Sequence, residues 1–205
     1  MPDTVSFGDS IARAVAILRA GGVIVYPTET VYGTGCDPFN RQAVDRIHDI
    51  KGRTNTKTML LIASSRRQVE DMTGPLDPVA SALADRFWPG PLTIVFKPAR
   101  ELPPHLLGPT GGTGFRVSTD PVSTALAREF GGPVVSTSAN RTGEPPLTTF
   151  EEARAQFNGL ADMILPSAGK MSRVPSTVVD VTGGKPVVIR QGEIPHDRLS
   201  EVLIQ

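Results

Sequence analysis

The chain has 205 residues, of which 39 % are hydrophobic, 20 % charged and 5 % aromatic. This length suits one domain that buries roughly 70 % of its unfolded surface without needing a disulfide or a metal. Lys plus Arg and Asp plus Glu both number 21, so the formal net charge is zero. That balance excludes a generally basic nucleic-acid coat protein and an acidic disordered tail, although it leaves room for a local basic patch.

Cysteine and histidine usage argues against a metal centre. The single cysteine, Cys36, excludes an intrachain disulfide, and the three histidines are scattered without ligand spacing. We therefore expect no protein-ligated metal. Residues 1–10 lack the cationic and apolar regions of a signal peptide, and no run approaches the roughly 20 apolar residues of a membrane span. The default expectation is a reducing, cytoplasmic location without membrane contact.

In chain order, apolar periodicity predicts a helix over residues 9–20, capped by Asp9 or Ser10, and then a buried strand over 23–26. A Thr- and Gly-rich loop or short hairpin follows over 27–38. Asn40 caps a second helix that runs to about Ile50. Further strands are predicted over 59–63, 92–96, 115–118, 133–137, 163–165, 176–181 and 186–190, and further helices over 66–72, 79–87, 121–130, 150–157 and 197–203.

Strands that alternate with helices predict an α/β fold. The last two strands, joined by Thr182-Gly183-Gly184, look like a hairpin, which predicts a mixed sheet. No repeat or linker interrupts the chain, so we expect one domain over residues 1–205. The phosphate-binding loop G-x-x-x-x-G-K-[ST], the esterase elbow G-x-S-x-G and the zinc motif H-E-x-x-H are all absent.

Polar clusters follow several predicted strands, and ligand sites in α/β sheets often occupy such strand ends. The segment 27–35 offers hydroxyls and glycines to a ligand, or forms a Thr-rich hairpin. The cations of Lys51-Gly52-Arg53 and Lys57 suit a phosphate chain, or complement the dipole of the preceding helix. The run Ser136-Thr137-Ser138-Ala139-Asn140 is a ligand loop or a turn. Arg116, inside a strand, is an exposed residue or a clamp for a carboxylate.

These segments, in this order, strongly resemble the YrdC-like family, the threonylcarbamoyl-AMP synthases. The resemblance covers about residues 14–192, and its most specific parts are the K-x-R and S-x-N signatures. It is carried by residues 22–33, Lys51-Gly52-Arg53, Trp88-Pro89-Gly90-Pro91-Leu92-Thr93, Arg116-Val117, Ser136-Thr137-Ser138-Ala139-Asn140, Ser176-Thr177-Val178 and Arg190-Gln191-Gly192.

The resemblance implies a twisted α/β sheet around a large concave cavity. It also implies an enzyme, a nucleotidyltransferase that condenses L-threonine, bicarbonate and ATP to threonylcarbamoyl-AMP and pyrophosphate. Downstream transferase proteins then use this product to modify the adenosine beside the anticodon of tRNA. The chain ends soon after Arg190 and so resembles the short form, without the extra C-terminal domain.

Residue roles follow from the same resemblance. Arg53, Lys57, Ser138 and Arg190 resemble the ATP contacts, and Thr30, Arg116, Ser136 and Ser176 resemble the threonine contacts. Lys51 and Asn140 complete the catalytic signature with Arg53 and Ser138 and support the phosphate region. ATP enters as a substrate, and any Mg²⁺ is expected to arrive with it and keep some of its waters.

Two departures bear on the details of the pocket. Family members often have His where this chain has Ile62, and a small polar residue where it has Pro145-Pro146. Two alternative functions therefore stay open. One is a double-stranded RNA- or tRNA-binding module, which would need a continuous basic face. The other is a diverged family member that acts on another carbamoyl-type substrate.

Overall fold

A computed structural model describes residues 6–52, 59–141, 143–167 and 169–203. Its strands form one continuous sheet in the order β7-β1-β2-β6-β3-β5-β4-β8-β9. The strands are β1 (Ile24–Tyr26), β2 (Gly33–Gly35), β3 (Leu60–Ala63), β4 (Leu92–Phe96), β5 (Thr113–Val117), β6 (Val134–Ser138), β7 (Met163–Ile164), β8 (Thr177–Asp180) and β9 (Val187–Arg190). The pairs β1–β7, β3–β5 and β4–β8 are parallel and the other pairs antiparallel, which confirms the predicted mixed α/β sheet.

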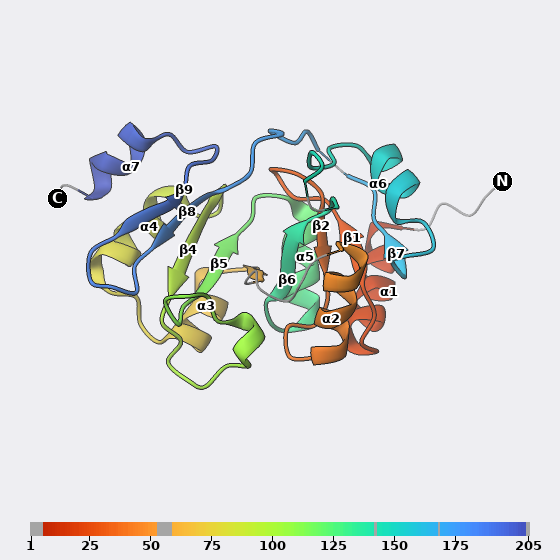
Figure 1. Ribbon diagram of the computed structural model, residues 1–205, viewed down its shortest axis with the longest axis horizontal. Coiled ribbons are helices and arrows are strands. Elements are labelled where there is room, and N and C mark those ends of the chain that lie inside the picture. Colours follow the sequence, from red (N-terminus) through yellow and green to blue (C-terminus); the bar gives the residue numbers. More distant parts are fainter. Residues whose placement is uncertain (1–5, 53–58, 142, 168, 204–205) are drawn as a thin grey trace.

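Helices cover both halves of this sheet (Figure 1). One half, around β1, β2 and β7, carries α1, α2 and α6, and the other, around β4, β8 and β9, carries α4 and α7. The helices are α1 (Phe7–Arg19), α2 (Arg41–Ile50), α3 (Arg66–Thr73), α4 (Pro78–Phe87), α5 (Pro121–Phe130), α6 (Phe150–Phe157) and α7 (His196–Leu203), with a 3-10 turn at Pro104–Leu106. No helix in these described ranges is long and apolar enough to cross a bilayer.

The predicted elements all exist, and their bounds differ where tertiary contacts or caps decide them. The helices α5 and α6 and the strand β4 have the predicted bounds. The helix α1 begins earlier than predicted because Ser6, rather than Asp9 or Ser10, is its cap; the Ser6 side chain accepts from the Asp9 N–H. The strand β5 begins at Thr113, because that residue pairs with Phe96 of β4. Strand pairing of this kind depends on distant residues and leaves no local signal.

A hydrogen-bonded carboxylate ties the edge of the sheet to α2. Asp162 Oδ2 accepts from the Val23 N–H at 2.7 Å and from Arg46 NH1 at 2.5 Å, while Arg46 NH2 donates to Asp162 Oδ1 at 3.0 Å. The Arg46 hydrogen bonds, joined by that of Val23, hold the pKa of Asp162 below its ordinary value. The ionised form of Asp162 is therefore the one that stabilises the fold.

Replacing Asp162 with alanine is expected to lower the free energy of unfolding by about 1–2 kcal/mol at pH 7. The side chain is partly exposed, so solvent screening reduces the effect of the charge. Because the folded pKa is depressed, this stabilisation is present above the unfolded pKa of about 3.9 and is lost as pH falls through the folded value. Urea unfolding of wild type and Asp162→Ala checks this: the difference should be full at pH 7 and shrink at about pH 3. A difference that grows in acid would contradict it.

Candidate active site

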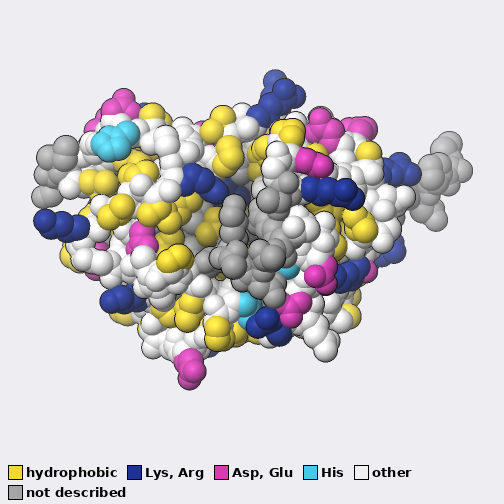
Figure 2. Space-filling model, in the orientation of Figure 1, with side chains coloured by type: hydrophobic (Ala, Val, Ile, Leu, Met, Phe, Trp, Pro, Cys, Tyr) yellow, Lys and Arg dark blue, Asp and Glu magenta, His cyan; other side chains and the backbone are white. Residues whose placement is uncertain are grey.

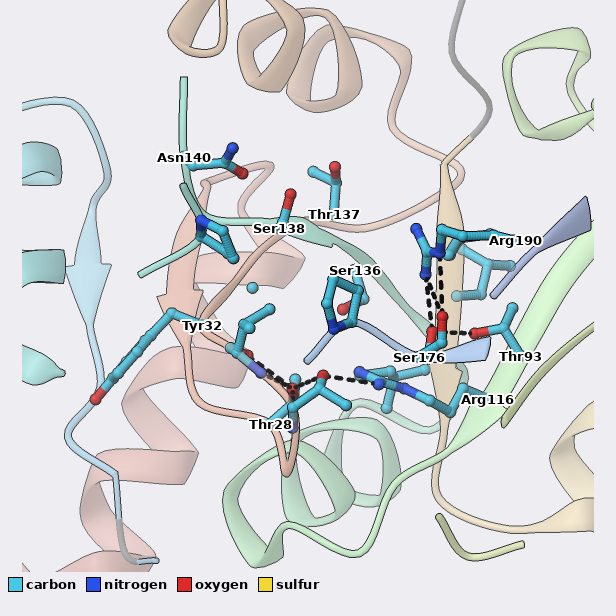
Figure 3. A pocket seen from close by; sticks show the side chains of 18 residues that line it. Thr28, Tyr32, Thr93, Arg116, Ser136, Thr137, Ser138, Asn140, Ser176 and Arg190 are labelled. Carbon is cyan, nitrogen blue, oxygen red and sulfur yellow. Dashed lines mark hydrogen bonds between the residues drawn. The ribbon is translucent and has the colours of Figure 1, made fainter. Parts of the chain in front are cut away.

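A cavity of about 340 Å³ opens between the two halves of the sheet. Its described walls come from the loop before β2, from β3 to β6, and from the start of β8 and the end of β9 (Figure 3). Its polar lining residues are Thr28, Thr30, Tyr32, Thr93, Arg116, Ser136, Thr137, Ser138, Asn140, Ser176 and Arg190. Figure 2 shows Lys and Arg side chains near the middle of this face, and further basic and acidic side chains spread over the rest of it.

Arg116 is a buried cation in this cavity rather than an exposed strand residue. It is 7 % exposed, and its NH1 donates to Thr30 Oγ1 at 2.9 Å. The same NH1 lies 3.3 Å from Glu29 Oε1. The interpretation of Arg116 as an exposed residue of the sheet is therefore wrong. A guanidinium at the wall of a cavity, with contacts at NH1 only among the described residues, suits an anionic group of a ligand.

Hydroxyl groups hold the loop beside Arg116. Thr28 Oγ1 donates to the Val31 carbonyl at 2.7 Å and accepts from the Thr30 and Val31 N–H groups, both at 3.2 Å. Thr30 Oγ1 lies 2.9 Å from Thr28 Oγ1 and accepts from Arg116 NH1 at 2.9 Å. A hydroxyl can donate as well as accept, so Thr30 suits a polar group of a ligand.

A second arginine, Arg190, lines the same cavity. Arg190 donates from Nε and NH2 to the Ser176 carbonyl, at 3.0 and 2.9 Å, and from NH2 to Ser176 Oγ at 2.9 Å. Ser176 Oγ also lies 2.9 Å from Thr93 Oγ1 (Figure 3). Burial, and then the nearby charge of Arg116, lower the pKa of Arg190. Two guanidinium groups that repel each other across one cavity favour an anionic ligand, because it relieves the repulsion.

The close packing of Gly192 keeps Arg190 on Ser176. A Cβ atom at Gly192 would lie 2.3 Å from the Pro175 carbonyl oxygen and 2.4 Å from the Ser176 carbonyl carbon. Both are backbone atoms, which a side chain could not displace without moving the strand. Only glycine lets the chain after β9 approach the start of β8 this closely.

Lys51 contacts the site by donating from its side chain to backbone carbonyls of the chain after β6. It follows α2, is 1 % exposed, and is absent from the described lining of the cavity. Its Nζ donates to the Ser138 carbonyl, in a short contact, and to the Asn140 carbonyl at 2.8 Å. Lys51 thus fixes the loop that follows β6, whose side chains Ser138 and Asn140 do line the cavity.

The other predicted residues divide into two groups. Thr30, Ser136, Ser138, Asn140, Ser176, Arg116 and Arg190 all line the cavity. Arg53 and Lys57 lie outside the described residues. The structure thus brings together seven of the predicted residues from separate parts of the chain.

Sequence reasoning gave no role to Thr93 or Glu29. Thr93 lines the cavity, and Glu29 lies behind Arg116. Thr28 and Tyr32, from the segment expected to offer hydroxyls to a ligand, line the cavity too. Thr93 carried a usable signal, since it is a hydroxyl residue in an otherwise apolar strand. Ile62 lines the cavity as well, and the Ile62↔Arg116 pairing in the parallel ladder puts both on the same face of the sheet. Of the two prolines, Pro146 lines the cavity.

Neither Tyr32 nor Cys36 has the properties of a nucleophile. Burial raises the pKa of Tyr32 to about 12, and its ring is directed away from the other labelled side chains (Figure 3). Burial likewise raises the pKa of the Cys36 thiol well above its ordinary value, and Cys36 is fully buried. The chemistry that the cavity supports is the binding and orientation of anions.

Comparison with known proteins agrees with this geometry. The family model Sua5_yciO_yrdC, described as "Telomere recombination", matches residues 16–192. The threonylcarbamoyl-AMP synthase of Coxiella burnetii (strain RSA 493 / Nine Mile phase I) is 41 % identical over 179 residues, 87 % of this chain and 96 % of the relative.

Two solved structures are similar over nearly the whole chain. P. abyssi Sua5 complexed with L-threonine has a TM-score of 0.89 and 31 % identity over 97 % of this chain, which spans 58 % of that protein. E. coli YciO has a TM-score of 0.83 and 31 % identity, covering 94 % of this chain and 92 % of its own. With its cavity, its signatures and its sheet, this chain belongs to the Sua5/YciO/YrdC family.

Proposed function

We propose that this chain is a threonylcarbamoyl-AMP synthase, which makes threonylcarbamoyl-AMP and pyrophosphate from L-threonine, bicarbonate and ATP. The observation that supports this most is the pair of arginines, the buried Arg116 and the more exposed Arg190, that line one cavity from separate strands. The reaction needs two anionic groups side by side, the carboxylate of threonine and the phosphates of ATP. A cavity with two separately anchored guanidinium groups offers one to each.

In this proposal Arg116 binds the threonine carboxylate. Thr30 forms a hydrogen bond with the amino acid, and Ser136 and Ser176 complete the amino-acid side. The nucleotide lies against Ser138 and Arg190, with Arg53 and Lys57 as further contacts. Lys51 and Asn140 support the nucleotide side, Lys51 by fixing the carbonyls of the loop after β6.

The bond changes are simple. The amine of threonine, once carboxylated, carries a carbamate whose oxygen attacks the α-phosphorus of ATP, and the bond from that phosphorus to the pyrophosphate oxygen breaks. Catalysis of this type consists of positioning and of stabilising charge, so no covalent nucleophile is needed. The described lining of the cavity contains no Asp or Glu. A Mg²⁺ ion would therefore be held by the phosphates and water, and would neutralise charge on the phosphates.

The product is a reactive mixed anhydride, which downstream transferase proteins would transfer to tRNA. We place this activity in the cytoplasm, where ATP and tRNA are available.

Weak binding of tRNA or double-stranded RNA would fit a local basic patch. Among the described residues, no group of three or more His, Cys, Asp or Glu could hold a metal ion.

The decisive experiment is pyrophosphate release from ATP in the presence of bicarbonate. We expect release with L-threonine, much slower release with L-serine and none without an amino acid. Turnover that does not depend on threonine would favour the diverged relative with another substrate. Absence of turnover, together with salt-sensitive binding of RNA, would favour the RNA-binding module.

A further inference from the structure

We propose that Glu29 is a positioning residue for the amino-acid substrate: it anchors one end of the Arg116 guanidinium so that the other end is presented to a carboxylate. This inference rests on the proposed function, because it takes the carboxylate to be that of threonine. Glu29 is absent from the described lining of the cavity and would act only through Arg116.

The guanidinium of Arg116 is held at one end only. NH1 donates to Thr30 Oγ1 at 2.9 Å and lies 3.3 Å from Glu29 Oε1. Nε and NH2 have no hydrogen bond with any residue that the structure describes. These two nitrogens form the edge of a guanidinium that matches the two oxygens of a carboxylate. The orientation of the free edge is therefore decided by the groups that hold NH1.

Glu29 is rigid enough to set that orientation. Its Oε2 accepts a short hydrogen bond from Ser118 Oγ. Ser118 Oγ in turn accepts from Ser123 Oγ at 2.9 Å and from the Asp120 N–H at 3.1 Å, at the N-terminus of α5. The backbone of Glu29 is held too, since its carbonyl accepts from the Ser172 N–H at 2.9 Å. Both ends of Glu29 are thus braced by elements outside the cavity.

Burial strengthens the ion pair between Glu29 and Arg116. The side chains of Glu29 and Arg116 are 12 % and 8 % exposed, so water competes weakly for either charge. Glu29 Oε1 is buried and has no hydrogen-bond partner among the described residues. Its polar contact among them is the ion pair with Arg116. Without that pair the guanidinium would have Thr30 as its remaining anchor and would be free to rotate about it.

Two variants separate anchoring from a merely structural role. Glu29→Ala removes the anchor, and the affinity for L-threonine should fall about ten-fold, the order of effect expected when one ion pair in a buried site is lost. Glu29→Gln retains an oxygen that can accept from NH1 and an N–H that can donate to Ser118. We therefore expect the affinity of Glu29→Gln for threonine to lie within about three-fold of wild type, so that glutamine restores most of what alanine loses.

The measurement is calorimetric titration with L-threonine and with L-threoninamide, which lacks the carboxylate. If Glu29 acts through Arg116, Glu29→Ala loses affinity for threonine while its affinity for threoninamide stays within about two-fold of wild type. Glu70→Gln serves as the matched control, because it breaks a similar ion pair, with Arg66 on α3, away from the cavity. Its affinities for both ligands should equal those of wild type.

The outcomes are separable. If Glu29→Ala does not fold, Ser118→Ala removes the brace on Oε2 together with the acceptor of Ser123 and Asp120, and it should cost about three-fold in threonine affinity but leave threoninamide affinity unchanged. Equal losses for threonine and threoninamide, or unchanged threonine affinity, would overturn the role of Glu29 while leaving the proposed function intact. Failure of the wild type to bind threonine at all would overturn the proposed function and this inference with it.

Discussion

Replacing Arg116 with alanine is expected to weaken the binding of L-threonine by about ten- to a hundred-fold. A charge-assisted hydrogen bond to a carboxylate in a buried site contributes about 1.5–3 kcal/mol, and the Nε and NH2 edge offers two such donors. ATP binding should change little, because the proposed nucleotide contacts are Arg190 and Ser138, and Arg190 has its own anchor on Ser176. Calorimetric titration of the variant with each substrate measures both effects.

The Arg116 variant needs two controls. Lysine should not restore threonine binding, since an ammonium lacks the planar fork of a guanidinium. Arg128→Ala removes an exposed arginine of α5 that pairs with Glu129 and should leave both affinities unchanged. Because alanine leaves Glu29 buried without its partner, the free energy of unfolding must be measured in parallel. Unchanged threonine affinity in a folded Arg116→Ala protein would mean that the amino-acid site lies elsewhere.

Lys51→Met should reduce turnover by about a hundred-fold or more, although Lys51 is absent from the described cavity lining. Methionine retains the length and volume of the side chain but cannot donate to the carbonyls of Ser138 and Asn140. Two buried carbonyls that lose a donor destabilise the fold by about 2–3 kcal/mol. The loop after β6 would then shift, and a shift of about 1 Å in groups that orient the substrate costs on the order of a hundred-fold in rate.

Steady-state kinetics and urea unfolding test the Lys51 prediction together. Lys97→Met is the matched control, because Lys97 is exposed on the chain after β4 and should show wild-type turnover and stability. A fall in stability without a fall in turnover would show that Lys51 supports the fold alone. If neither quantity changes in Lys51→Met, the tether from α2 to the loop has no energetic importance.

The elements of the fold were predictable where local chemistry decides them. Asn40 caps α2 as expected, because its side chain accepts from the Ala43 N–H. The helix α5 begins at Pro121, after its cap Asp120, and is ended by Gly131 in the left-handed conformation. Both ends are therefore determined by neighbouring residues in the sequence. The order of the strands was not predictable, since β6 lies between β2 and β3 through pairings with residues that are distant in the sequence, such as Gly33 with Ser138 and Leu60 with Ser136.

The candidate site shows the same division. Motifs and the family resemblance identified Ser138, Ser176 and Arg190, which the structure brings to one cavity. The partner of Arg116 was not foreseen, because Glu29 approaches it only through the pairing of distant strands. Nor could the motif alone show that Lys51 donates to carbonyls rather than facing the cavity, since its environment is made by the chain after β6.

The place of each arginine in the sheet has a consequence for local opening. Arg116 lies on β5, which has paired strands on both sides, whereas Arg190 ends β9, the last strand in the order of the described sheet. Edge strands open at lower free energy than interior ones, so hydrogen exchange reaches them first. Local unfolding of β9 would move Arg190 away from the cavity, while Arg116 on β5 would stay in place. Under the proposed assignment, in which Arg190 contacts the nucleotide and Arg116 the amino acid, the free energy of closing β9 is part of the nucleotide affinity only.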